Sequence, residues 1–139
     1  MPTTAETVEQ YLTALGWSYQ PAEGLPGVWL THVESEACAL DLQVRLNPHW
    51  LMVAGLYLRA DQVPPARRAA LAEHLLQLNH RYPLVKFGLD DDGDVRLSTE
   101  LPANDVSQSQ FQAALQMIAL VGLECHPACL QVISEEGPS

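Results

Sequence analysis

The stretch 86-KFGLDDDGDVRLSTELP-102 decides the fold, because its pattern predicts two paired strands and the turn that joins them. Alternating residues on either side of the aspartates would share one face of a sheet: Val85, Phe87, Leu89, Val95, Leu97 and Thr99. A two-residue turn would set Leu89 opposite Arg96, whereas the three-residue loop 91–93 sets Leu89 opposite Val95 and matches the apolar faces. We therefore predict a hairpin whose Gly93 takes the left-handed conformation that such loops need.

The aspartates of this turn also raise the alternative of a cation site. A helix–loop–helix calcium loop needs acidic residues at its positions 1, 3 and 5, glycine at 6 and glutamate at 12. With Gly93 at position 6, Gly88 falls at position 1 and Thr99 at position 12, so two essential ligands are missing. We therefore favour a plain turn over a weak cation site, and we expect neither a metal nor a cofactor.

The composition is that of one globular domain, with 139 residues of which 47% are hydrophobic. We expect the domain to span residues 1–133 and residues 134–139 to form a disordered tail. The net charge is −10, and no cluster of Lys and Arg exists that could bind nucleic acid directly. The N-terminus lacks a signal-peptide pattern and the longest apolar run, residues 50–58, is too short to span a bilayer, so we expect a cytoplasmic protein without membrane binding.

Working outward from the hairpin, the sequence predicts three helices and three further strands. The first helix begins with a capping box at Thr3 and Glu6 and ends at Gly16. Strands are expected over residues 28–34, 37–46 and 50–59, and a second helix after Pro64 and Pro65, ending before Pro83. A last helix begins at Ser107, with Gln110 completing a capping box, and Pro127 would kink or end it. The order is helix, three strands, helix, two strands, helix, which predicts an α+β fold with an antiparallel sheet.

The strand over residues 50–59 is apolar on both faces, so it needs cover on two sides. One side would be the core of the domain, and the other would be covered either by the first helix or by a foreign chain. Tryptophan is enriched where interfaces bind tightly. We therefore name four candidate partner-binding residues, which are Trp29, Trp50, Leu51 and Val53.

The second helix has an apolar face wider than one packing partner requires. One stripe contains Leu71, Leu75, Leu78 and Tyr82, and a second contains Ala69, Ala72 and Leu76. Either a curved sheet uses both stripes, or one stripe contacts a second subunit. We favour a homodimer and take Leu71, Leu75 and Leu78 as the candidate subunit contact.

The sequence contains none of the local motifs that would identify a catalytic or nucleotide-binding site. The five histidines are scattered, and no HExxH, G-x-S-x-G or glycine-rich phosphate loop is present. Cys125 and Cys129 have no second ligand pair, so we expect them to be core residues. We predict a protein that is not an enzyme, with no catalytic residues; the competing classes are a small enzyme and a small-molecule sensor.

The segment 75-LLQLNHRYPLVKFGLDDDGDVRLSTELP-102 resembles the bacterial YbjN family, whose fold is similar to that of class I type III secretion chaperones. The likeness lies in L-N-x-R-x-P at the end of a leucine-rich helix, then K-F, an acidic glycine turn, V-R-L and E-L-P. The resemblance implies an acidic homodimer without catalytic residues that holds partner polypeptides on exposed apolar surface. We accordingly expect a chaperone-like adaptor or regulator that binds another protein.

Overall fold

Six strands form one antiparallel sheet in the order β1-β2-β3-β4-β6-β5. The structure is a computed structural model that describes residues 1–135. Its strands are β1 (Tyr19–Pro21), β2 (Val28–Glu34), β3 (Ala39–Leu46), β4 (Trp50–Leu58), β5 (Val85–Leu89) and β6 (Val95–Pro102). Its helices are α1 (Ala5–Ala14), α2 (Arg68–Arg81) and α3 (Gln108–Ser134), with two short 3₁₀ turns, η1 (Ala60–Gln62) and η2 (Pro65–Arg67), before α2.

The hairpin of β5 and β6 has the predicted register. Leu89 lies opposite Val95 and Phe87 opposite Leu97. The N–H of Asp90 donates to the carbonyl of Asp94 at 3.0 Å, and Gly93 has a φ of 82°. A three-residue loop with a left-handed glycine therefore joins the two strands, as the matching of apolar faces predicts.

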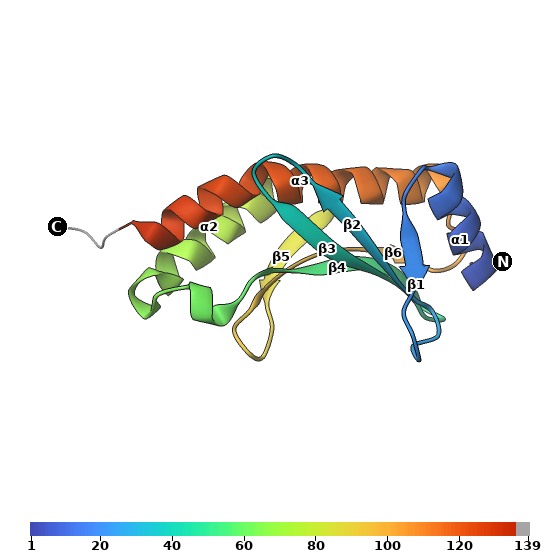
Figure 1. The fold of residues 1–139 in the computed structure, drawn as a ribbon, viewed down its shortest axis with the longest axis horizontal. Helices are drawn as coiled ribbons and strands as arrows, with labels where there is room; N and C mark the ends of the chain where they lie inside the picture. The colour runs from blue at the N-terminus through green and yellow to red at the C-terminus, as the bar shows by residue number, and fades with distance from the viewer. Residues whose placement is uncertain (136–139) are drawn as a thin grey trace.

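The helices pack on one face of the sheet, and α3 runs along its length (Figure 1). Ser107 and Gln110 form the predicted capping box at the start of α3. The predicted core side of this helix is buried, as are both of its cysteines: Phe111, Leu115, Ile118, Val121, Cys125 and Cys129. The α+β fold and the antiparallel sheet are therefore confirmed, and the buried side of α3 belongs to one apolar core with the sheet and the other helices.

Two local predictions at the N-terminal end were wrong. Thr4, and not Thr3, caps α1: its hydroxyl accepts the N–H of Thr7 at 3.2 Å. The connector after α1 contains the short strand β1, which pairs with β2 through Tyr19, Gln20 and Pro21. Three residues are too few to show an alternating pattern, so the sixth strand escaped prediction.

Pro127 does not end the last helix, which continues to Ser134. Because proline has no N–H, the carbonyl of Leu123 loses its helical donor, and the thiol of Cys38 lies 4.0 Å from it. The tail was expected to begin at Ser134, but that residue is helical, and residues 136–139 lie outside the described residues.

By length and composition, α3 is the one helix within residues 1–135 that could cross a membrane. A core helix of a folded domain passes the same test, because both need a long apolar segment. Here α3 packs on the sheet, with residues such as Phe111 and Leu115 fully buried. The expectation that no apolar segment is long enough overlooked α3, because Gln112, Gln116, Glu124 and His126 interrupt its apolar residues.

Candidate functional site

The face of the sheet that points away from α3 forms an open groove of about 1130 Å³. Strands β2, β3, β4 and β6 supply its floor, and the start of β1 borders it. Side chains on this face are exposed or half-buried, whereas their neighbours one residue along each strand are buried under the helices. This alternation makes the groove a one-sided surface of a sheet whose other side is the core.

An apolar strip runs along β4 on this open face of the sheet, and its residues from Met52 to Leu56 line the groove. It consists of Trp50, Met52, Ala54 and Leu56, and Trp50 and Leu56 are 45% and 41% exposed. Half-buried Leu30 of β2 adds apolar surface beyond Gln43, which lies opposite both Leu30 and Ala54. Large apolar side chains on a central strand are normally covered, so this strip is the main candidate for contact with another molecule.

Ion pairs and polar contacts surround the apolar strip. The carboxylate of Asp90 accepts from Arg96 at 3.0 Å, and Lys86 lies 2.7 Å from Glu100. Arg45 instead donates to the amide oxygen of Gln43 at 2.9 and 2.6 Å. The groove is thus apolar along its middle and charged along its borders, which is the anatomy of a protein-binding surface.

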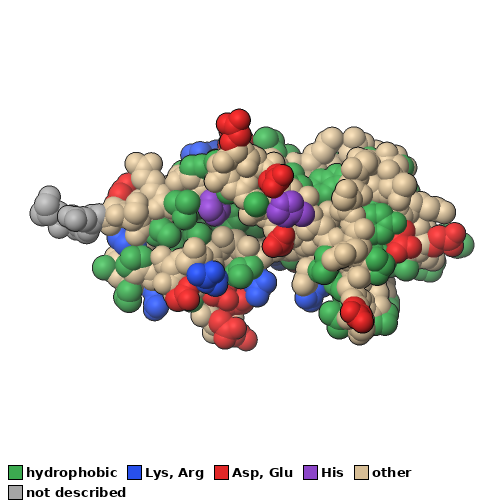
Figure 2. All heavy atoms as spheres, viewed as in Figure 1, with side chains coloured by type: hydrophobic (Ala, Val, Ile, Leu, Met, Phe, Trp, Pro, Cys, Tyr) green, Lys and Arg blue, Asp and Glu red, His purple; other side chains and the backbone are tan. Residues whose placement is uncertain are grey.

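His32 of β2 lies between two carboxylates on the same face. Its Nδ1 is 2.8 Å from Asp41 on β3, and its Nε2 is 3.3 Å from Glu34. Figure 2 shows a histidine flanked by acidic side chains in the middle of the visible face. The hydrogen bond that His32 donates to Asp41, followed by the one it donates to Glu34, raises the pKa of His32 above its ordinary value of 6.5.

We expect Asp41→Asn to lower the pKa of His32, because the largest of the interactions that raise it is removed. Since the folded pKa is raised, the pair stabilises the fold fully below pH 6.5, and this stabilisation is lost as the pH rises through the folded pKa. NMR titration of the His32 ring protons in both proteins measures the shift. Equal midpoints in the two proteins would show that the pair does not form.

The four candidate partner-binding residues divide between the two faces of the sheet. Trp50 is exposed on the open face at the start of β4, beyond the residues that line the groove, but Trp29, Leu51 and Val53 are buried on the helix side. The indole N–H of Trp29 donates to Glu9 of α1 at 2.9 Å, so α1 covers that part of the sheet. The sequence left open whether the first helix or a foreign chain covers the second apolar face of β4. In the structure the helices cover the face that contains Leu51 and Val53, and the face that contains Trp50 is open.

Met52, Ala54 and Leu56 are groove residues that the list of candidates omitted. The alternation along β4 placed Met52 and Leu56 on the same face as Trp50, but it could not tell which face was open. Strict alternation would also place Leu58 on that face, whereas the register shifts between Leu56 and Leu58, and Leu58 is buried. A bulge adds a residue to one strand and so moves the following side chain to the other face.

The two apolar stripes of α2 face in the opposite directions from those expected from the sequence, in which the first stripe would contact a second subunit. Leu71, Leu75 and Leu78 have 3, 5 and 3% of their surface exposed and belong to the core of the single chain. Leu76 of the second stripe is 69% exposed and borders a shallow depression of about 750 Å³. The expected exposure of the first stripe is therefore wrong, because α2 packs with it against the chain's own sheet and α3.

The side chain of Asn79 on α2 closes the outer edge of β5. Its amide oxygen accepts the N–H of Phe87 at 2.7 Å, and its amide nitrogen donates to the carbonyl of Phe87 at 3.0 Å. Both backbone groups of Phe87 that point away from β6 are thereby satisfied. An edge strand blocked in this way has fewer free groups to pair with another strand.

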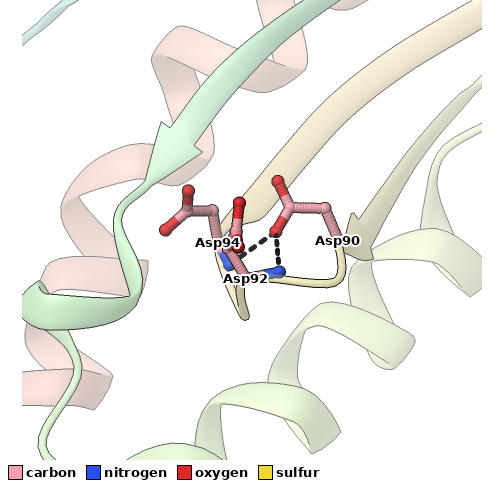
Figure 3. Close-up of side chains that lie close together, drawn as sticks. All are labelled: Asp90, Asp92 and Asp94. Atoms are coloured by element: carbon pink, nitrogen blue, oxygen red, sulfur yellow. Dashed lines mark hydrogen bonds between the residues drawn. The ribbon is translucent and has the colours of Figure 1, made fainter.

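The aspartates of the β5–β6 turn mainly serve the turn itself. Asp90, Asp92 and Asp94 each have a carboxylate oxygen within 4.8 Å of the others (Figure 3). One oxygen of Asp90 accepts the N–H groups of Asp92 and Asp94 at 2.9 and 3.0 Å, and Asp94 accepts the N–H of Ala60 at 2.6 Å. The Arg96 guanidinium and these N–H groups hold the pKa of Asp90 below its usual range. Hydrogen bonds within and beside the turn therefore hold the carboxylates of Asp90 and Asp94 in place.

The buried titratable groups lie between α3 and the sheet. The hydroxyl of Tyr57 donates to the carbonyl of Gly122 at 2.6 Å, and burial raises the pKa of Tyr57. Burial also raises the pKa of Cys129 to about 12 and lowers the pKa of His126. A thiol held protonated in this way is a poor nucleophile, so these groups behave as core residues.

The sequence model of the YbjN family, described as "Putative bacterial sensory transduction regulator", matches residues 4–131. Among curated proteins, none matches the chain by sequence. Solved structures with a similar fold include YbjN from E. coli, described as "a putative transcription regulator". It is 21% identical to this chain with a TM-score of 0.65, over 88% of this chain and 91% of the E. coli chain.

Two further similar structures are protein–protein complexes. A chain of the ExsC–ExsE complex is 14% identical with a TM-score of 0.59, over 90% of this chain and 95% of its own length. A chain of the heterodimeric ExoU–SpcU complex of the type III secretion system of Pseudomonas aeruginosa is 17% identical with a TM-score of 0.58. The match covers 91% of this chain and 98% of that chain. At these identities the likeness shows the fold, which is that of type III secretion chaperones.

Proposed function

The chain belongs to the YbjN family, and we propose that it binds another polypeptide on the open face of its sheet, as a chaperone-like adaptor or regulator in the cytoplasm. The apolar strip of β4 in an uncovered groove is the observation that carries this proposal. A site for a small molecule would be enclosed and would bury most of its ligand. The groove is instead open along its length, which suits an extended or helical segment of a protein.

The family and the similar structures support a binding role over a catalytic one. The family model describes regulators, and the ExsC–ExsE and ExoU–SpcU structures are complexes of two proteins. The strongest pKa shifts, those of Tyr57 and Cys129, belong to side chains packed in the core. A catalytic site would place such groups in a cleft.

The partner proposal is tested by affinity purification of the tagged protein from its host, followed by mass spectrometry. The double variant Trp50→Ala/Leu56→Ser removes apolar surface from the open face of the sheet, and we expect it to lose the captured partner. Leu120→Ser is the matched control, because Leu120 is 53% exposed on α3, away from the groove. Capture that survives the double variant, or that Leu120→Ser abolishes, would contradict the proposal.

Homodimerisation is the second part of the proposal, and the exposed stripe of α2 is its candidate surface. Leu76 lies among the polar side chains of Glu73, Gln77 and His80. An exposed leucine ringed by polar groups is a common arrangement for an interface. Light scattering at micromolar concentration should give the mass of two chains, and Leu76→Lys should give the mass of one. A single-chain mass for the unaltered protein would rule the dimer out.

A further inference from the structure

The two ends of the groove differ in charge. The turn between β2 and β3, the end of β4 and the turn between β5 and β6 all lie at one end of the sheet, because Glu34 pairs with Ala39 and Val95 pairs with both Leu58 and Leu89. Eight of the seventeen acidic residues belong to this end of the sheet, and two of them, Asp41 and Asp90, line the groove itself; the others are Glu34, Glu36, Asp61, Asp91, Asp92 and Asp94. Figure 2 shows acidic side chains gathered on the β5–β6 turn. The cations at this end are fewer, namely Arg59, Arg96 and His32 when it is protonated.

The opposite end contains Arg45 and, across Met52 from it, the ion pair of Lys86 with Glu100. The partner of Arg45 across the strands is Met52 of the apolar strip, and the guanidinium contacts the uncharged amide of Gln43. Arg96 and Lys86, by contrast, are each paired with a carboxylate. Among the arginines and lysines of the groove face within residues 1–135, Arg45 is thus the one without a carboxylate partner.

We infer that the groove takes a polypeptide segment that is itself dipolar, with apolar side chains on the strip of β4, basic residues at the aspartate end and an acidic residue at Arg45. Opposite charges at both ends favour one direction of the segment and disfavour the reverse, which places like charges together. A second copy of this chain fits poorly as the occupant, since its net charge of −10 repels the acidic end. This inference rests on the proposed function and specifies the chemistry of the partner.

Synthetic peptides provide the test. The probes are two fluorescein-labelled peptides with a core of alternating Val and Thr. One has three Lys at its N-terminus and two Glu at its C-terminus, and the other has these charged ends exchanged. A third peptide with the same core and only acidic ends is the comparison. Fluorescence anisotropy should show that at least one dipolar peptide binds tenfold or more tightly than the acidic one. Its affinity should fall as NaCl is raised. Equal affinities for all peptides, or no binding by any of them, would overturn the inference.

Charge variants locate the two ends. Asp91→Asn/Asp92→Asn should weaken binding of the dipolar peptide about twofold to fivefold per charge, and Arg45→Gln should weaken it similarly. Arg45→Gln should have no effect on a peptide whose Glu residues are replaced by Gln. Glu124→Gln on α3 is the control for the loss of one acidic charge, because Glu124 lies on the other side of the molecule. Unchanged affinity in the groove variants would overturn the inference.

The inference and the proposed function can fail separately. If the native partner is captured through the groove but binds the Arg45 and Asp91/Asp92 variants as tightly as the unaltered protein, the charge inference is wrong and the proposed function stands. If capture is insensitive to Trp50→Ala/Leu56→Ser, the proposed function itself is wrong.

Discussion

Val53→Asp is expected to unfold the protein, even though Val53 is on the strand that carries the partner surface. Val53 is 1% exposed, and its side chain points into the core under the helices. A carboxylate there would be buried without a partner, which costs several kcal/mol, a large part of the about 5–15 kcal/mol that stabilises a typical domain. Circular dichroism with urea unfolding should show loss of the cooperative transition or a fall of at least about 3 kcal/mol in the free energy of unfolding.

Leu56→Asp is the matched variant on the other face of the same strand. Leu56 is 41% exposed in the groove, so the new carboxylate keeps its contact with water. We expect the free energy of unfolding to change by less than about 1 kcal/mol. If Leu56→Asp unfolded the protein and Val53→Asp did not, the assignment of the two faces of β4 would be reversed. The pair also shows that a substitution at Val53, which we named from the sequence as a candidate partner-binding residue, is unsuitable as a test of partner binding.

Asn79→Ala is expected to lower the free energy of unfolding by about 2 kcal/mol, because the N–H and carbonyl of Phe87 both lose their partner. Urea unfolding measures the change. Asn79→Asp is the control: its carboxylate can still accept the N–H of Phe87 but cannot donate to the carbonyl. Its effect should therefore lie between those of the unaltered protein and Asn79→Ala. Equal stability of the unaltered protein and Asn79→Ala would show that Asn79 does not support the edge of β5.

Opening the edge of β5 should also promote association between chains. The freed N–H and carbonyl of Phe87 could pair with a strand of another molecule, as exposed strand edges do. Light scattering of Asn79→Ala at increasing concentration should show species larger than those of the unaltered protein. Identical mass distributions for the two proteins would contradict this role for Asn79.

The hairpin and the last helix could be predicted because their signals are local. The register of β5 and β6 follows from matching Leu89 with Val95, and the start of α3 follows from Ser107 and Gln110. The faces of β4 and α2 could not be assigned in the same way. Leu51 and Trp50 are both apolar, as are Leu75 and Leu76, so the hydrophobic pattern is nearly symmetric. Only the placement of α1, α2 and α3 on one side of the sheet decides which of them is buried.

Only part of the groove could be predicted from the sequence, because its contacts also depend on how distant elements pack. Its borders combine His32 with Asp41 and Arg96 with Asp90, and these pairs depend on strand register and on the turn. Asn79 and Phe87 are eight residues apart, and their contact depends on how α2 packs beside β5. No motif spacing encodes such contacts. The turn over residues 90–94 is the opposite case, in which a local pattern is present. Its aspartates suggest a metal site, whereas their hydrogen bonds stabilise the turn.

The affinity of the captured partner for the groove variants tests the central claim most directly. Isothermal titration calorimetry would compare the unaltered protein, Trp50→Ala/Leu56→Ser and Leu120→Ser, after unfolding curves confirm that all three are folded. We predict that the double variant in the groove raises Kd at least tenfold, about 1.4 kcal/mol, while Leu120→Ser stays within twofold of the unaltered protein. An unchanged Kd for the double variant, with a raised Kd for Leu120→Ser, would place the partner on α3 and contradict the account.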